Sequence, residues 1–493
     1  MYKKSTILFL IAILVCAAGL AQNESDFMTD GTGTITTYDG WGTEVVIPDK
    51  IGGVPVRAIG DGVFRSIGLT KVAIPAGVTL IGDNAFTGNK LTDVVVPAGV
   101  TRIGNGAFAQ NQLTTIIIPD SVTDIGNDAF SGNKLTRVTL GANVNFLQST
   151  FSNNMFVEYI LNGKKSGTYN PSILFTSGKE GDFNFLETTY GAIITGYFGS
   201  ELNRLVIPGQ LRGVSVRGIQ GLGNKRIGRM QLPEGIVFID ANAFAGNQLT
   251  TIDIPESVFY IGTSAFADNK LTSINIPKGV DVITNYAFSG NQLTSVIIPD
   301  GVIAVYNGAF GSNQLTNVTI PESVFYIGAS AFRNNRLAGI AIPDGVEFIG
   351  ESAFRDNQLT NVTIPAGVGI ISERVFQGNQ LTNVTIPKSV LSIGDSAFEN
   401  NKLTSVTIHK GVISIGVSAF WNNQLTSVVI PDSVLSIGRT AFERSNLTNV
   451  TMPNGVKLGM RAFGSNSTLD TFYNNNGMKA GTYVIEKNRW TMR

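Results

Sequence analysis

The sequence predicts a repeat solenoid, in which short coils of chain stack and each coil buries its apolar face against its neighbours. A phenylalanine recurs every 22 residues from Phe64 to Phe130 and again from Phe244 to Phe442. The residues around each phenylalanine follow one template, seen most clearly in residues 381–402. A fixed period between roughly 20 and 50 residues is typical of solenoids. Function in such proteins usually lies on an extended surface, so we do not expect a catalytic pocket.

The template predicts one short parallel strand per repeat. From Leu381 to Ile386 apolar and polar residues alternate and β-branched side chains are frequent, which is typical of a strand with one buried face. Pro387 cannot donate to a hydrogen-bonded ladder and should end the strand. Gly394 suits a corner with positive φ, and the turn after it should bring Phe398 into the core. Stacking these strands about 4.8 Å apart would arrange the phenylalanines as a spine opposite the sheet.

An asparagine follows the phenylalanine by three residues in most repeats. This row can be interpreted as a ligand-binding surface or as an inward amide ladder that satisfies backbone groups between coils. We favour the second interpretation, because buried polar groups need partners. Asn-Val-Thr triplets match the N-glycosylation acceptor, but they lie in the strand template, whose repetition explains them. The row comprises Asn89, Asn111, Asn133, Asn247, Asn269, Asn291, Asn313, Asn335, Asn357, Asn379, Asn401 and Asn423.

The first 21 residues are predicted to be a signal peptide for export. Lys3 and Lys4 precede an apolar run, and a small-x-small sequence ends at Ala21. The apolar run is too short to cross a membrane and no second one follows, so the sequence predicts no membrane span. Cys16 leaves lipid attachment open, although Val15 stands where a smaller residue is expected. We expect the protein at the cell surface or secreted, with the periplasm or a lipid anchor at Cys16 as the alternative.

The composition argues against most other classes of function. Charged residues make up 15% of the chain and balance at 36 of each sign, so there is no basic surface for nucleic acid. The only cysteine lies in the predicted signal peptide. The only histidine, His409, stands where nearly every other repeat has proline. The residues that nucleophilic and metal-binding sites usually require are therefore almost absent from the sequence. We expect no enzyme activity, no cofactor and no small-molecule substrate.

The repeat resembles the BspA-like type of leucine-rich repeat. The pattern L-x-x-V-x-I-P-x-x-V-x-x-I-G-x-x-A-F-x-x-N covers roughly residues 45–155 and 200–466. It departs from the general leucine-rich pattern, because its asparagine comes at the end of the repeat and not shortly after the strand. The resemblance implies a leucine-rich-repeat-like right-handed coil. It also implies a bacterial surface or secreted protein that binds host or bacterial surface proteins and has no catalytic residues.

Repetition on a larger scale predicts two capped modules. Terminal coils of a solenoid would expose core, so they need atypical capping units. Two segments that each follow a repeat array resemble each other, residues 162–169 and 476–483. Two segments that each precede an array also resemble each other, residues 46–57 and 206–217. The predicted modules are residues 22–175, with about five repeats, and residues 183–493, with about 11 repeats, joined by residues 176–182. A single stack with an irregular middle is the alternative.

The predicted partner-binding surface is the outward side of the strands. Residues on either side of the central valine point out of the sheet, and in the second array many of them are neutral amides and hydroxyls. They can be interpreted as a binding surface or as solvated strand formers. Trp421 is a further candidate because tryptophan is enriched at binding hot spots, with packing in a divergent repeat as the alternative. The strand candidates are Asn317, Thr319, Asn361, Thr363, Asn383, Thr385, Ser405 and Thr407.

Two functions remain open at this point. The first is an exported, non-catalytic module for adhesion or interaction, whose partner is a host matrix protein or a bacterial surface protein. The second is a structural or scaffolding component of the cell envelope without a host ligand. At the position just after the template proline, earlier repeats carry acidic residues and later repeats carry Lys388 and Lys410. This separation of charges along the stack can orient a partner.

Overall fold

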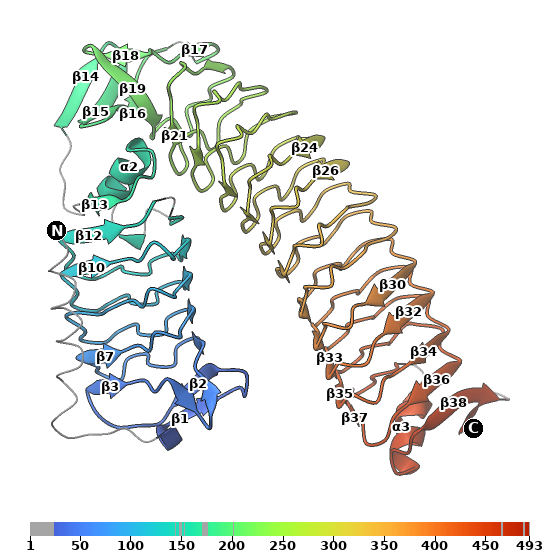
Figure 1. Cartoon of the computed structure of the whole chain (residues 1–493). Coiled ribbons are helices and arrows are strands. Elements are labelled where there is room, and N and C mark those ends of the chain that lie inside the picture. Colours follow the sequence, from blue (N-terminus) through green and yellow to red (C-terminus); the bar gives the residue numbers. More distant parts are fainter. Residues whose placement is uncertain are drawn as a thin grey trace. The chain divides into compact units, whose positions relative to one another are not determined.

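The computed structural model describes residues 24–142, 144–146, 150–151, 153–169, 176–200, 202–464, 467–486 and 489–492. The predicted signal peptide and Cys16 lie outside these residues. The chain divides into two compact units, Met1–Phe175 and Thr176–Arg493, which run from blue to teal and from green to red in Figure 1. Each unit is a stack of coils and is described separately.

A regular repeat contributes one or two short strands. In one such repeat, β30 (Asn383–Ile386) is the predicted strand, and β31 (Ser392–Ile393) follows after the proline turn. β30 pairs in parallel with β32 (Ser405–Ile408), while β31 pairs in parallel with β29 (Ile370–Ile371) and β33 (Ser414–Ile415). We call the stacked strands of the first kind the first ladder and those of the second kind the second ladder. The parallel strand predicted at each step of 22 residues is confirmed, and the second ladder is an addition to it.

The first unit is held together by one long second ladder. Its elements are η1 (Glu24–Asp26), β1 (Phe27–Thr29), β2 (Thr34–Tyr38), β3 (Glu44–Val46), β4 (Lys50–Ile51), β5 (Val54–Pro55), β6 (Ala58–Ile59), β7 (Lys71–Ala73), β8 (Leu80–Ile81), β9 (Arg102–Ile103), β10 (Thr115–Ile117), β11 (Asp124–Ile125), β12 (Arg137–Leu140), α2 (Asn153–Leu161) and β13 (Gly167–Tyr169). Six strands pair in the order β1-β2-β6-β8-β9-β11, whereas the first ladder forms the shorter groups β3-β7 and β10-β12-β13.

The second unit repeats this plan over more coils. It begins with β14 (Thr176–Glu180), β15 (Phe183–Thr188), β16 (Gly191–Tyr197), β17 (Leu205–Val206), β18 (Gln210–Leu211), β19 (Val214–Ile219), β20 (Met230–Gln231), β21 (Phe238–Ile239), β22 (Tyr260–Ile261), β23 (Val282–Ile283), β24 (Ser295–Ile297), β25 (Ala304–Val305), β26 (Asn317–Thr319), β27 (Tyr326–Ile327) and β28 (Phe348–Ile349). After β29 to β33 come β34 (Ser427–Val429), β35 (Ser436–Ile437), β36 (Asn449–Met452), β37 (Lys457–Leu458), α3 (Ser467–Asn475), β38 (Gly481–Glu486) and β39 (Arg489–Met492). The second ladder includes the sheets β23-β25-β27-β28 and β29-β31-β33-β35-β37.

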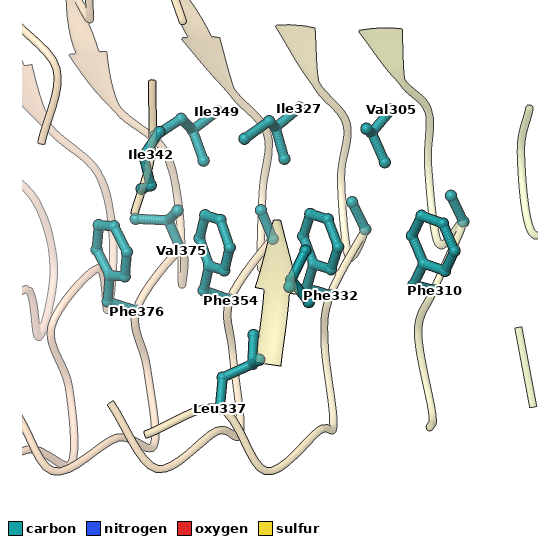
Figure 2. Close-up of a cluster of buried hydrophobic side chains, with 14 of the residues drawn as sticks. Val305, Phe310, Ile327, Phe332, Leu337, Ile342, Ile349, Phe354, Val375 and Phe376 are labelled. Carbon is teal, nitrogen blue, oxygen red and sulfur yellow. The ribbon is translucent and has the colours of Figure 1, made fainter. Parts of the chain in front are cut away.

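The predicted phenylalanine spine is present in both units. Neighbouring rings stack nearly parallel, with centroids 5.1 Å apart for Phe64 and Phe86 and 5.6 Å apart for Phe332 and Phe354. Figure 2 shows four rings of the second unit in one row, between the aliphatic side chains of the second ladder and Leu337. The row continues past Phe442 to Phe463, one repeat further than the strict period indicated. Stacked aromatic pairs add about 0.5–1.5 kcal/mol to the gain from burial.

The asparagine row is the inward amide ladder that the sequence favoured. The Asn379 Nδ2 donates to the carbonyls of Phe354 in the preceding repeat, at 2.9 Å, and of Phe376 in its own repeat, at 3.1 Å. Its Oδ1 accepts from the backbone N–H of Leu359 at 3.0 Å. The same bonds recur at the equivalent asparagines of both units, for example at Asn111. Each amide thus satisfies backbone groups that would otherwise be buried without partners.

The template glycine has a different role from the predicted one. Gly394 is not among the residues with positive φ, whereas Ser396, two residues later, has a φ of 55°. A Cβ on Gly394 would lie 2.8 Å from the Ile371 carbonyl oxygen and 2.7 Å from the Glu373 nitrogen. Glycine suits this corner because the backbone of the preceding repeat approaches closely, although other repeats carry a side chain there, as at Asp240 and Thr284.

The ends of both units carry related caps. The Tyr159 hydroxyl of α2 donates to the Gly141 carbonyl and accepts from the Val144 N–H, at 3.2 and 2.8 Å. The Tyr473 hydroxyl of α3 makes equivalent bonds to the Pro453 carbonyl and the Val456 N–H. At the opposite ends, the antiparallel strands β1 and β2 cover the first coil of one unit, and β14, β15 and β16 cover that of the other. These elements shield apolar coil ends that have no neighbouring repeat.

Candidate binding surfaces

Two carboxyl groups of the described chain have a raised pKa, and both bind backbone groups. Among the described residues there is no group of three or more His, Cys, Asp or Glu side chains that could hold a metal. Burial raises the pKa of Asp240 and of Asp470 to about 6. Asp240 occupies the template glycine position and accepts from the Ala241 N–H at 2.7 Å, and Asp470 accepts from the Phe463 N–H at 3.2 Å. Both carboxyl groups therefore bind backbone groups of their own corner or cap.

The predicted candidates of the two adjacent strands β30 and β32 lie together on the outward face of the first ladder. The register places Asn383 beside Ser405 and Thr385 beside Thr407. All four residues are exposed, while the residues between them point inward. The strands therefore present two parallel rows of polar side chains, which we call the first-ladder face.

The remaining strand candidates occupy equivalent positions in other repeats. Asn317 and Thr319 are exposed on β26, where Thr319 lies beside the exposed Ile297 of β24. Asn361 and Thr363 are also exposed but belong to a stretch without assigned strand structure. The structure thus places all the strand candidates on the outward side of their repeats, in rows that continue along the stack.

The fold uses one threonine row of the first ladder and leaves the candidate rows unused. The Thr404 hydroxyl donates to the Thr382 carbonyl of the preceding repeat at 3.2 Å, and Thr316 donates to Thr294 in the same way at 3.2 Å. In contrast, within the described residues the side chains of Thr385 and Thr407 make no hydrogen bond to the protein. Among the strand candidates, Asn361 has one such contact, a 3.5 Å bond to the adjacent Thr360.

A second outward face, which the sequence analysis did not identify, carries exposed apolar side chains. It lies on the second ladder of the second unit, at the positions between the template valine and isoleucine. Tyr326 and Phe348 stack there with centroids 5.0 Å apart and planes 8° apart. Exposed fractions range from 38% at Phe325 to 64% at Leu435, while Tyr326 is half-buried. We call it the second-ladder face, and its members are Phe325, Tyr326, Phe348, Ile370, Leu391, Ile413 and Leu435.

A row of charges borders the second-ladder face. In every repeat of this region, the residue that directly follows the template proline is exposed. In one repeat His409 takes the place of that proline. Because Lys388 precedes Leu391 by only three residues, the charge row and the apolar row lie within about 10 Å of each other. Along the stack the charge row reads Asp300, Glu322, Asp344, Ala366, Lys388, Lys410 and Asp432.

Comparison with protein families identifies the repeat. The family model described as "BspA type Leucine rich repeat region" matches this chain at residues 43–160, 237–359 and 347–470. These segments cover more than half of the sequence. The chain belongs to the BspA-type leucine-rich repeat family. The comparison with curated proteins gave no match.

Solved structures similar to this BspA-type protein come from several bacteria. A leucine-rich repeat protein from Bacteroides ovatus shares 19% identity over 89% of each chain, with a TM-score of 0.36. A leucine-rich cell surface protein from Faecalibacterium prausnitzii shares 20% identity over 90% of this chain and 95% of its own, with a TM-score of 0.26. The pneumococcal vaccine antigen PcpA shares 18% identity over 58% of this chain and 78% of its own, with a TM-score of 0.40.

Trp421 does not join the strand candidates of this BspA-type protein. It lies directly after its spine residue Phe420, away from both ladders, and is half-buried. The Arg444 guanidinium of the next repeat lies over its ring, 4.6 Å from the centroid. A cation over a tryptophan face is a stabilising packing contact between repeats. This contact favours the packing interpretation that the sequence left open.

The BspA-type template explains why the second-ladder face went unnoticed. Each second-ladder strand is only two residues long, as in Ser392–Ile393, so it shows no alternation of its own. The signal was nevertheless present, since large apolar residues such as Phe348 and Leu391 stand between two inward positions of the same turn. No helix in the described ranges is long and apolar enough to cross a membrane.

Proposed function

We propose that this BspA-type repeat protein is exported and acts without catalysis, binding another protein at the cell surface or after secretion. The basic start, apolar run and small-x-small site of residues 1–21 support export. The repeat architecture supports binding, because stacked repeats present an extended surface. The partner class we propose is a host matrix protein or a bacterial surface protein, and the role is adhesion or interaction.

The observation that carries this proposal is the pair of polar rows on the first-ladder face. Thr385 and Thr407 are exposed, side by side, and not used by the fold, unlike the neighbouring Thr404. Hydroxyl and amide groups of this kind supply adaptable hydrogen bonds to a protein surface. Each repeat offers only two such side chains, so a stable interface of roughly 800 Å² per partner must extend over several repeats.

The proposal can be tested with the chain from Gln22 onward, which contains every described residue. Binding to immobilised matrix proteins and bacterial surface proteins would be measured by biolayer interferometry. Changing Thr385→Arg together with Thr407→Glu should abolish binding, because the added bulk and charge sit at the centre of the face. The matched control changes the exposed Gln358→Arg and Gln424→Glu on another side of the stack, and should bind like the unaltered chain.

Two outcomes would count against the proposal. Binding that survives the Thr385 and Thr407 changes would move the site away from the first-ladder face. Absence of the protein from the material released by protease treatment of intact cells, and from the medium, would contradict surface exposure and secretion. If no foreign protein binds at all, the structural or scaffolding role in the envelope becomes the better proposal, and the exposed apolar second-ladder face favours that role.

A further inference from the structure

We infer that two copies of this chain associate through the second-ladder face of the second unit, in antiparallel orientation, about a two-fold axis at the repeat of Ala366 and Ile370. This interface uses a different face and a different partner from the proposed function, so it is independent of it. Three features of the described residues lead to it: an exposed apolar stripe, a self-complementary row of charges, and a match of large to small side chains.

The exposed apolar stripe on the second-ladder face is the first feature. Ile370 is 58% exposed on β29, and Leu391 and Leu435, which directly precede β31 and β35, are 53% and 64% exposed. The strands pair Ile370 with Ser392 and Ser414 with Ser436, so the apolar side chains shift by one position within the turn after Ile370. The stripe continues on the other side of Ile370 with Phe348, which is 45% exposed. Scattered surface leucines are normal, but contiguous exposed apolar rows mark interaction sites. A run over this many repeats has the length expected of a protein interface and not of a small-ligand site.

The charge row identifies the occupant as a second copy. From the centre at Ala366, the row carries Asp344 and then Glu322 in one direction, and Lys388 and then Lys410 in the other. All four charged residues are exposed. Reversing the row about Ala366 therefore sets each acidic side chain opposite a lysine of the second copy. With the row paired in parallel, Asp344 would instead meet Asp344 and Lys388 would meet Lys388, which repulsion disfavours.

The same axis matches side chains by size. A two-fold axis along the strand direction turns each row onto the same row of the other copy in reverse order. The aromatic Phe348 then faces Ser392, and Tyr326 faces Ser414, so large rings meet small side chains. Ile370 faces Ile370 at the centre. In the neighbouring row the operation sets Phe325 opposite Ile413 and Glu347 opposite Leu391, and Lys388 of the second copy lies three residues before that leucine.

Charge reversal provides the first test, again with the chain from Gln22 onward. Sedimentation velocity should show a dimer for the unaltered chain at micromolar concentrations. Lys388→Glu with Lys410→Glu makes the row acidic, and Glu322→Lys with Asp344→Lys makes it basic, so each variant alone should be monomeric. An equimolar mixture of the two should form dimers again, because the four facing pairs nearest the axis are then attractive. The control, Lys270→Glu with Lys402→Glu, changes the same number of exposed lysines elsewhere in the unit and should leave the dimer intact.

Cross-linking tests the orientation, since the chain from Gln22 contains no cysteine. Facing sheets lie about 10 Å apart, so a short bismaleimide should link two Ala366→Cys copies at the axis. Asp300→Cys should not link to itself, because in the antiparallel dimer it faces Asp432, roughly 29 Å from its own counterpart at ~4.8 Å per repeat. Asp300→Lys should tighten the dimer several-fold by replacing that repulsive pair.

The result has clear alternatives. A monomeric unaltered chain, or charge-reversed variants that dimerise alone and gain nothing from mixing, would overturn the inference. Efficient linking at Asp300→Cys would overturn the antiparallel orientation. Circular dichroism of each variant checks that the repeats remain folded. Because dimerisation and binding of a foreign protein are measured separately and use different faces, failure of one leaves the other standing.

Discussion

The two units build the same coil, but their second-ladder faces differ in chemistry. In the first unit, the second-ladder face carries Thr79, Thr101 and Thr123, whose hydroxyls each donate to a carbonyl of the preceding repeat. In the second unit the corresponding region carries exposed aromatic and aliphatic side chains such as Phe325 and Leu391. The outward positions therefore differ between the units while the inward positions stay the same.

The first ladder does not show a matching difference. In the first unit its outward row includes Val95 and Ile117, which are 68% and 62% exposed. In the second unit the equivalent positions hold Thr385 and Thr407 but also Ile297 and Val429, which are 71% and 62% exposed. The comparison teaches that the spine and the amide ladder determine the coil, whereas the side chains of the outward rows can vary in polarity and size.

The largest effect should come from shortening the spine in one unit only. Phe376→Ala should lower the free energy of unfolding of the second unit by about 3–5 kcal/mol through cavity formation. The transition of the first unit should stay in place, because its core is separate. Urea denaturation followed by circular dichroism would resolve the two transitions. The control is Phe348→Ala on the exposed second-ladder face, for which we expect a change of less than about 1 kcal/mol in a monomeric background.

The same measurement tests whether the units are independent modules. If both transitions shift together in Phe376→Ala, the chain behaves as a single cooperative stack. In that case the two-module interpretation of the sequence would have to be replaced by the single-stack alternative.

A smaller effect is expected from the amide ladder. Asn379→Ala removes partners from the carbonyls of Phe354 and Phe376 and from the N–H of Leu359. Leaving such buried groups unsatisfied should cost about 1–3 kcal/mol, measured by the same denaturation experiment. The exposed Asn383→Ala should change stability by less than about 0.5 kcal/mol. Equal losses at the two asparagines would contradict the structural role assigned to the inward row.

The smallest effect concerns a carboxyl group that the second unit has and the first lacks. Asp240 stands where the first unit has glycines such as Gly60, and burial raises its pKa from 3.8 to about 6. A raised pKa in the folded state means that stability is full below pH about 4 and declines until the pH passes about 6, by about 2–3 kcal/mol at most. Asp240→Asn should remove much of this decline in the second unit. Asp470, whose pKa is also raised to about 6, should account for the remainder.

The outcome of this pH experiment is read from thermal unfolding between pH 4 and pH 7. The first unit serves as the internal control, because its repeats carry Gly60, Gly82, Gly104 and Gly126 at the position of Asp240. A pH profile of the Asp240→Asn variant that is unchanged from that of the original chain would show that Asp240 is not protonated on folding.

The inward half of the structure could be predicted from the sequence, because burial restricts it. Phenylalanine fills the spine in most repeats, and an asparagine amide reaches three backbone groups, so Phe376 and Asn379 recur with the period. The misassigned corner at Gly394 shows a limit of this reasoning. Glycine is compatible both with a positive φ and with close backbone approach, and only the neighbouring repeat decides between them.

The outward half could be predicted only where strand alternation made it visible. Alternation located the first-ladder candidates such as Thr385, and their side chains do point outward. The two-residue strands of the second ladder carry no such pattern, and their pairing depends on the next repeat and not on local sequence. The packing of Trp421 likewise depends on Arg444 in another repeat. The sequence pattern therefore predicts contacts between repeats less well than it predicts the structure within a repeat.

The short reach of the amide ladder has a consequence for the history of the chain. Asn379 bonds to groups of its own repeat and of the one before it, as Asn401 and Asn423 do in turn. A gene duplication or deletion that adds or removes one whole repeat would thus leave every remaining joint chemically intact. Lineages can lengthen or shorten the array without repairing its core, and each new copy begins with an outward surface on which selection can act.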